Sequence, residues 1–122
     1  MLSFEEIKSN LKKCTVGIAG AGGLGSNVAM SLTRVGIGKL IIIDFDIVTE
    51  SNLNRQFYFK HQVGFKKVDA LRANLLSINP NLTLETHDAK LDENNILNFF
   101  RDVDVMVEAF DRAEMKQVII EK

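Results

Sequence analysis

The sequence predicts an α/β fold of the Rossmann type, an open and mainly parallel sheet with helices on both faces. Short runs of β-branched residues alternate with longer segments of helical period, an order that joins parallel strands by right-handed crossovers. A glycine-rich turn follows the first such run, and an aspartate ends the second. The 122 residues are enough for one domain with a buried core. We therefore expect residues 1–122 to form a single domain.

Each element has its own pattern. Phe4, Ile7 and Leu11 stand at helical spacing and predict a short amphipathic helix within residues 1–13. Apolar runs and alternation predict strands at residues 15–19, 39–43, 82–86 and 102–110. Helical spacing and helix-ending Gly and Pro residues predict helices at 24–35, 64–78 and 94–100, and another beginning at Asp111. The polar stretch 44–62 has no clean period, and long segments of this kind are commonly functional.

Composition excludes several classes of function. With 15 Lys and Arg against 16 Asp and Glu, the net charge is -1, whereas nucleic-acid binding needs a basic surface. No apolar run approaches the ~20 residues that span a bilayer, and the acidic N-terminus does not resemble a secretory signal. Cys14 is the single cysteine, so neither an internal disulfide nor a zinc cluster is expected. We expect a cytoplasmic domain that binds neither nucleic acid nor a membrane.

The sharpest motif is the turn Gly20-Ala21-Gly22-Gly23-Leu24-Gly25, which matches G-x-G-x-x-G between a strand and a helix. Gly20 and Gly22 allow a tight turn and close approach of a ligand, while Gly25 lets helix and strand pack closely. The helix N-terminus offers N–H groups to a phosphate. Asp44 lies about 20 residues further on, where a carboxylate accepts hydrogen bonds from ribose. Together these features predict a nucleotide site rather than a turn without a ligand.

The residues after Asp44 favour a triphosphate over a nicotinamide. Arg55 and Lys67 are two cations within reach of such a nucleotide, and they would neutralise charge on a departing pyrophosphate. Asp111 follows the last strand, where a carboxylate could hold magnesium between phosphates. Each of these three residues also has a plainer interpretation. Arg55 could be a solvated loop residue, Lys67 a surface lysine beside Lys66, and Asp111 a helix N-cap.

At these residues the sequence resembles the ThiF/MoeB/HesA family, the adenylating enzymes related to ubiquitin-activating enzymes, with the ThiF branch of sulfur-carrier adenylyltransferases as the nearest match. The resemblance covers most of the chain. It rests on Gly20 to Ser26, Asp44-Phe45-Asp46, Ser51-Asn52-Leu53-Asn54-Arg55-Gln56, Gly64 to Val68, and Asp111. Members of the family usually continue well beyond this length, so the resemblance also implies that residues 1–122 are the N-terminal part of a longer protein.

The resemblance implies an ATP site. Gly23 would lie against ATP, Asp44 would hold the ribose, Arg55 and Lys67 would bind phosphate, and Asp111 would coordinate magnesium. It also implies that further nucleotide contacts come from Asp46, Ser51, Asn52 and Asn54.

The implied reaction is attack by the C-terminal Gly-Gly carboxylate of a small ubiquitin-like sulfur carrier on the α-phosphorus of ATP. The products would be an acyl adenylate and pyrophosphate, with thiamine biosynthesis as the expected pathway and a homodimer as the expected assembly. Two alternatives stay open from the sequence: an NAD(P)-dependent oxidoreductase domain, and a nucleotide-binding module without turnover.

Overall fold

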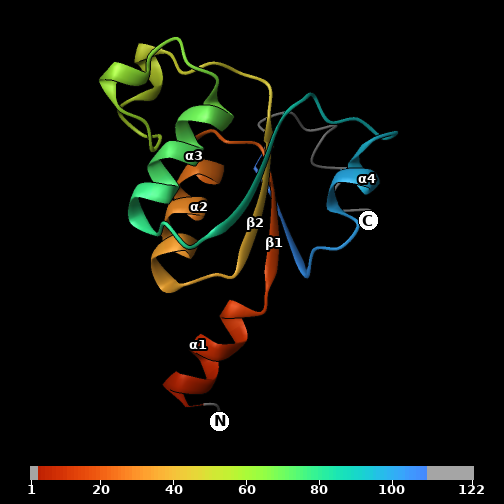
Figure 1. Ribbon diagram of the computed structural model, residues 1–122. Coiled ribbons are helices and arrows are strands. Elements are labelled where there is room, and N and C mark those ends of the chain that lie inside the picture. Colours follow the sequence, from red (N-terminus) through yellow and green to blue (C-terminus); the bar gives the residue numbers. More distant parts are fainter. Residues whose placement is uncertain (1–2, 110–122) are drawn as a thin grey trace.

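The computed structural model describes residues 3–109, which form a four-stranded parallel sheet flanked by helices (Figure 1). The strand order is β3-β2-β1-β4. The strands are β1 (Thr15–Ala19), β2 (Lys39–Asp44), β3 (Thr83–Asp88) and β4 (Val105–Glu108). The α-helices are α1 (Phe4–Lys12), α2 (Gly23–Val35), α3 (Lys67–Ile78) and α4 (Ile96–Phe100), and two short 3-10 turns, η1 (Glu50–Asn52) and η2 (Lys60–Gln62), lie between β2 and α3. The Rossmann-like fold predicted from the sequence is confirmed.

The two faces of the sheet carry separate cores, because alternate side chains of a strand point to opposite sides. Ile18, Leu40 and Ile42 belong to the core that also contains Ala29 of α2 and Leu71 of α3. On the other face, a second core joins residues of β1 and β2 to α4: Ala19, Ile41, Ile43, Leu91, Ile96 and Phe100. Figure 1 shows α2 and α3 on one side of the sheet and α4 on the other. Helices thus cover both faces, as predicted.

The topology places a ligand site at the carboxyl end of β1. From β1 the chain crosses to β2 and β3 on one side and then to β4 on the other, so the strand order reverses between β1 and β4. Ligands of open α/β sheets bind at such a switch point. Ala19 at the end of β1 pairs with Ile43 and Glu108, and the glycine turn and Asp44 follow directly.

Several boundaries differ from the sequence prediction; the strand expected at residues 82–86, for example, is Thr83–Asp88. The helix expected from residue 64 begins at Lys67, because Gly64 N–H donates to Val48 O and Ile47 forms an antiparallel bridge with Lys66. The helix expected from residue 94 begins at Ile96. The strand expected from residue 102 begins at Val105, and Asp104 N–H and Ala109 N–H on either side of β4 also donate to Thr15 O and Ala19 O of β1. The helix predicted to begin at Asp111 lies outside the described residues.

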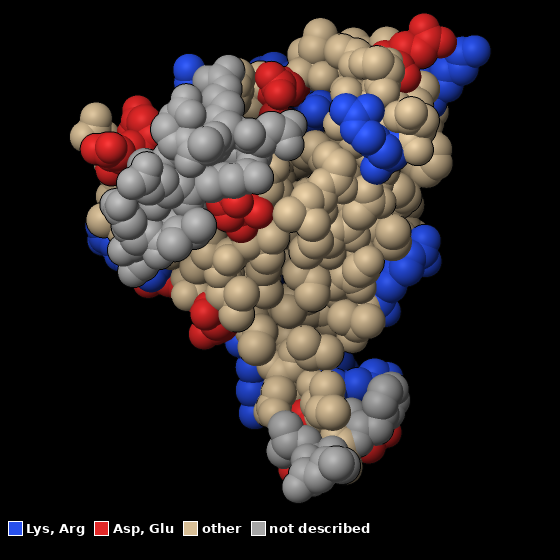
Figure 2. Space-filling view, turned by 180° about the vertical axis from the view of Figure 1, so that it is seen from behind, with Lys and Arg blue, Asp and Glu red and all other residues tan. Residues whose placement is uncertain are grey.

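On the visible part of the face in Figure 2, Lys and Arg residues are scattered among Asp and Glu around an uncharged centre. None of the helices within residues 3–109 has the length and apolarity needed to cross a membrane.

Candidate nucleotide-binding site

The glycine turn is shaped by its own backbone. Gly20 has φ +104°, in the left-handed region that favours glycine, and its N–H donates to Ile43 O at 2.8 Å. Helix α2 then starts with Gly22 as its N-cap and without a side-chain cap. The N–H groups of Gly23, Leu24 and Gly25 have no acceptor within residues 3–109. An uncapped helix start of this kind can take up an anion.

The glycines of this turn differ in the space around them. A Cβ on Gly25 would overlap the carbonyl oxygen of Gly20, so the strand and helix can meet only if residue 25 lacks a side chain. A Cβ on Gly23 would have no atom of residues 3–109 within 4 Å. Among these residues the space over the start of α2 is therefore open, as a ligand contact there requires.

Asp44 is held against the glycine turn. It is 5% exposed, its Oδ2 accepts from Ala21 N–H at 2.6 Å, and its Oδ1 accepts from Asp46 N–H at 2.7 Å. Two backbone donors thus fix the carboxylate, and each oxygen keeps a further lone pair that a ribose hydroxyl can use. The two features that the sequence predicted to act together do lie together.

The Arg55 segment is tied to the start of α2 by a residue that the sequence analysis did not single out. Asn27 Nδ2 donates to Gly23 O at 2.6 Å and to Arg55 O at 2.8 Å. The Arg55 guanidinium is exposed, and its Nη1 donates to Ser51 O at 3.0 Å and Asn54 Oδ1 at 3.3 Å. Within residues 3–109 it has no carboxylate partner. Its charge therefore remains available to a phosphate near α2.

Two further buried residues, Ser26 and Tyr58, form hydrogen bonds that hold the segment after Arg55 against the glycine turn and α2. Ser26 Oγ accepts from Phe57 N–H at 3.0 Å, and Tyr58 donates its hydroxyl to Ala21 O at 2.6 Å. A clue was present in the sequence: Ser26 and Asn27 are adjacent polar residues in the first turn of a helix made largely of small and apolar residues. Their partners lie in a distant segment that periodicity cannot identify.

Tyr58 should resist ionisation in the folded protein. Burial, and then the negative charge of Asp44, raise its pKa above the ordinary value of about 10. Above about pH 10 the unfolded chain ionises while the folded chain does not, so the free energy of unfolding falls by up to about 1.4 kcal/mol per pH unit. Tyr58 is the only tyrosine. Tyrosinate absorbance should therefore appear near pH 10 in denaturant and only at higher pH, or upon unfolding, without it; coincident titrations would contradict the buried position.

Lys67 and Lys66 are neighbours with different environments. Lys66 is exposed and its Nζ lies 2.8 Å from Asp88 Oδ2, a hydrogen bond that raises the pKa of Lys66. Lys67 is only 6% exposed, and its backbone N–H donates to Asp46 O at 3.0 Å. Its ammonium has no carboxylate partner in the described part of the chain. Because buried lysines are ordinarily paired, Lys67 is the strongest indication of an anionic ligand.

The other predicted site residues have varied positions. Asp46 is exposed; its backbone N–H donates to Asp44 Oδ1, and its backbone carbonyl accepts from Lys67 N–H. Ser51 Oγ lies 3.0 Å from Thr49 Oγ1, and Asn52 Oδ1 accepts from Thr49 N–H at 2.9 Å. These contacts shape η1. Asp111, the predicted magnesium ligand, lies outside the described residues. Among residues 3–109 there is no group of three or more His, Cys, Asp or Glu suited to a metal ion.

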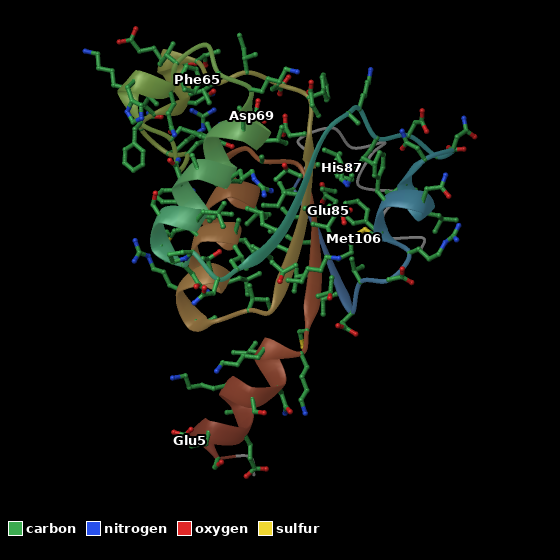
Figure 3. The ribbon with its side chains drawn as sticks, viewed as in Figure 1. Glu5, Phe65, Asp69, Glu85, His87 and Met106 are labelled. Carbon is green, nitrogen blue, oxygen red and sulfur yellow. The ribbon has the colours of Figure 1, made fainter. Side chains whose placement is uncertain are left out.

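A separate polar cluster lies on β3, on the face that α4 covers. His87 Nε2 is 2.7 Å from Glu85 Oε2, and Lys39 Nζ is 3.7 Å from Glu85 Oε1. The bond with His87 lowers the pKa of Glu85, and the His87 ring packs on Phe99 at 4.8 Å between centroids. Figure 3 shows Glu85 and His87 together on β3, while Asp69 lies at the start of α3 and Phe65 on the segment that precedes it. This cluster contributes no contact to the glycine turn.

Comparisons with known proteins agree with this geometry. The model of the ThiF family matches residues 2–122. Ubiquitin-like modifier-activating enzyme 5 of Branchiostoma floridae is 36% identical over 121 residues, covering 89% of this chain and 30% of the relative. The same enzyme of Caenorhabditis elegans is 47% identical over 78 residues, covering 64% of this chain and 19% of the relative. The chain thus spans less than a third of the length of either relative.

Solved structures of adenine nucleotide complexes share the fold. E. coli tRNA N6-threonylcarbamoyladenosine dehydratase, TcdA, in complex with ATP is 27% identical with a TM-score of 0.91, covering 95% of this chain and 49% of TcdA. E. coli MccB with AMPCPP and MccA is 28% identical with a TM-score of 0.84, covering 93% of this chain and 34% of MccB. With the match to the family model, these findings show that the chain belongs to the ThiF family.

Proposed function

We propose that this chain forms the ATP-binding part of an enzyme that adenylates a carboxylate. The observation that carries the proposal is Lys67, a lysine 6% exposed without a carboxylate partner in residues 3–109. An anion is the expected partner of such a group. The uncapped start of α2 and the fixed carboxylate of Asp44 support a phosphate and a ribose in the same ligand.

In the proposed reaction, a carboxylate oxygen attacks the α-phosphorus of ATP. A bond forms between that oxygen and phosphorus, and the bond from the α-phosphorus to the bridging oxygen breaks. Pyrophosphate leaves with the electron pair, and no proton moves because the carboxylate is already ionised. The chain's contribution is therefore to position the groups and to neutralise charge. Arg55 and Lys67 would do so at the phosphates, while Asp44 would hold the ribose.

Magnesium is proposed as the metal that accompanies ATP. When bound with ATP, it would supply positive charge that lowers the repulsion that an approaching carboxylate meets. Asp111 is the residue proposed to hold it, on the strength of its sequence motif. Carboxylate oxygen is the donor type that magnesium prefers.

The proposed acyl substrate is the C-terminal carboxylate of a small ubiquitin-like protein. The names of the relatives in B. floridae and C. elegans favour a ubiquitin-like modifier, and MccB has been crystallised with the peptide MccA. A sulfur carrier of thiamine biosynthesis stays a narrower prediction from the sequence, as do a homodimer and a cytoplasmic location.

Exchange of labelled pyrophosphate into ATP tests the function. With magnesium and a ubiquitin-like protein ending in Gly-Gly, we expect exchange that requires both the acyl substrate and this protein. The matched control is the same substrate without its last two glycines, which should give no exchange. ATP binding without exchange for any Gly-Gly substrate would instead indicate a module without turnover.

A further inference from the structure

Two buried side-chain amides pair with each other between α3 and the segment that follows Arg55. Gln62 is 3% exposed and Asn74 is 7% exposed. Gln62 Nε2 donates to Asn74 Oδ1 at 2.7 Å, and Asn74 Nδ2 donates to Gln62 Oε1 at 3.0 Å. A buried and fully bonded polar network of this kind fixes one arrangement of the groups that it joins.

The pair is also bonded to the main chain on both sides of Tyr58. Asn74 Nδ2 donates to Phe57 O at 3.0 Å, and Gln62 Oε1 accepts from Phe59 N–H at 3.0 Å. A carbonyl can only accept and an N–H can only donate, so these two contacts fix which end of each amide faces the main chain. Residues 57–59 are therefore held to α3 in a single register.

The two amides have no donor left for a ligand. Each amide nitrogen carries two N–H groups, and both nitrogens donate twice, because Gln62 Nε2 also donates to Ala70 O at 3.4 Å. The pair therefore acts on the protein's own main chain rather than on a bound molecule.

The amides join the two parts of the chain that carry the cations of the candidate site. Asn74 lies seven residues after Lys67 on α3, so these two buried side chains share one face of that helix. Residues 57–59 follow closely after Arg55, whose own carbonyl is bonded to Asn27 of α2. A shift of residues 57–59 along α3 would thus move Arg55 relative to Lys67.

We propose that Gln62 and Asn74 are positioning residues of the adenylation site, whose paired amides hold Arg55 at a fixed place relative to Lys67. The inference rests on the proposed function and adds to it two residues that act through Arg55. The charge that Arg55 would neutralise grows as pyrophosphate leaves, so its placement should affect the reacting state more than ATP binding. Small displacements of such groups have large effects on rate.

Exchanging the two amides tests the pairing. Gln62→Asn shortens one side chain by a methylene group and Asn74→Gln lengthens the other, while the double variant keeps both amides and their combined length. In the pyrophosphate exchange assay with a ubiquitin-like protein ending in Gly-Gly, we expect each single variant to lower kcat about 10- to 100-fold. The KM for ATP should change less than about threefold. The double variant should recover kcat to within about threefold of the wild type.

Ile96→Val is the control for a simple loss of stability. It removes one methylene group from the core on the opposite face of the sheet, so it should lower Tm and leave kcat unchanged within about twofold. Asn74→Ala removes the amide without adding bulk. It replaces Asn74→Gln if that variant does not fold, and it should lower kcat in the same way.

Unchanged kcat in the folded single variants, or in Asn74→Ala, would overturn the proposal and leave the amide pair a purely structural one. A double variant whose Tm recovers while its kcat stays low would overturn it as well. Absence of exchange in the wild-type protein would instead contradict the proposed function, and the positioning role would fail with it.

Discussion

Lys67→Met should weaken ATP binding about 10- to 100-fold, the range expected when a hydrogen bond to a charged group is lost. The same variant should be at least as stable as the wild type without ligand. Methionine keeps the apolar stem of Lys67, which is 6% exposed, and removes a positive charge without a carboxylate partner within residues 3–109. Calorimetry and thermal unfolding measure the two effects, which should have opposite signs.

Lys66→Met is the matched control for Lys67→Met, because it removes the same kind of charge one residue away. Lys66 is exposed and already paired with Asp88, so we expect ATP affinity to change less than about twofold. Equal losses of affinity in both variants would show a diffuse effect of net charge. Unchanged affinity in Lys67→Met would remove the main support for the nucleotide site.

Gly25→Ala should destabilise the fold by about 3 kcal/mol or more, because the new Cβ would overlap the carbonyl oxygen of Gly20. A backbone atom cannot give way as a flexible side chain can, so strand β1 and helix α2 would have to separate. For a domain of this size the loss corresponds to a fall in Tm of about 10 °C or more. Thermal and urea unfolding of the ligand-free protein measure it.

Gly23→Ala is the companion experiment in the same turn. In the described part of the chain no atom lies within 4 Å of the Cβ that it adds, so stability should stay the same or rise by up to about 1 kcal/mol through helix propensity. The methyl group would occupy the space proposed for the nucleotide, and ATP affinity should fall about tenfold. Normal ATP binding by Gly23→Ala would place the nucleotide elsewhere, and normal stability of Gly25→Ala would contradict the close contact with Gly20.

Local patterns were sufficient to predict most of the fold. The apolar runs at β1 and β2, the glycines between β1 and α2, and the aspartate that ends β2 are short-range signals, and the structure has each of them. The start of α3 was wrong by three residues. The sequence around residues 64–66 is compatible with a helix, but the backbone of these residues pairs with Ile47 and Val48 instead. Tertiary contacts override local helix propensity in such cases.

The candidate site was predicted less completely. Asp44, Arg55 and Lys67 were identified by residue type and spacing, yet spacing could not show that Lys67 is buried while Lys66 is exposed and paired. Asn27 and Tyr58 were missed because their partners, Arg55 and Ala21, lie far away in sequence. Such contacts depend on how the long segment between β2 and α3 folds back over α2, which no periodicity encodes.

The glycine turn, Asp44 and Lys67 are proposed to form one site for ATP. Calorimetric titration of the chain with magnesium and ATP, beside an identical titration with NAD, tests it most directly. We expect saturable binding of ATP, no comparable binding of NAD, and a marked loss of ATP affinity in Lys67→Met but not in Lys66→Met. Preferred binding of NAD, with the same affinity in wild type and Lys67→Met, would contradict it.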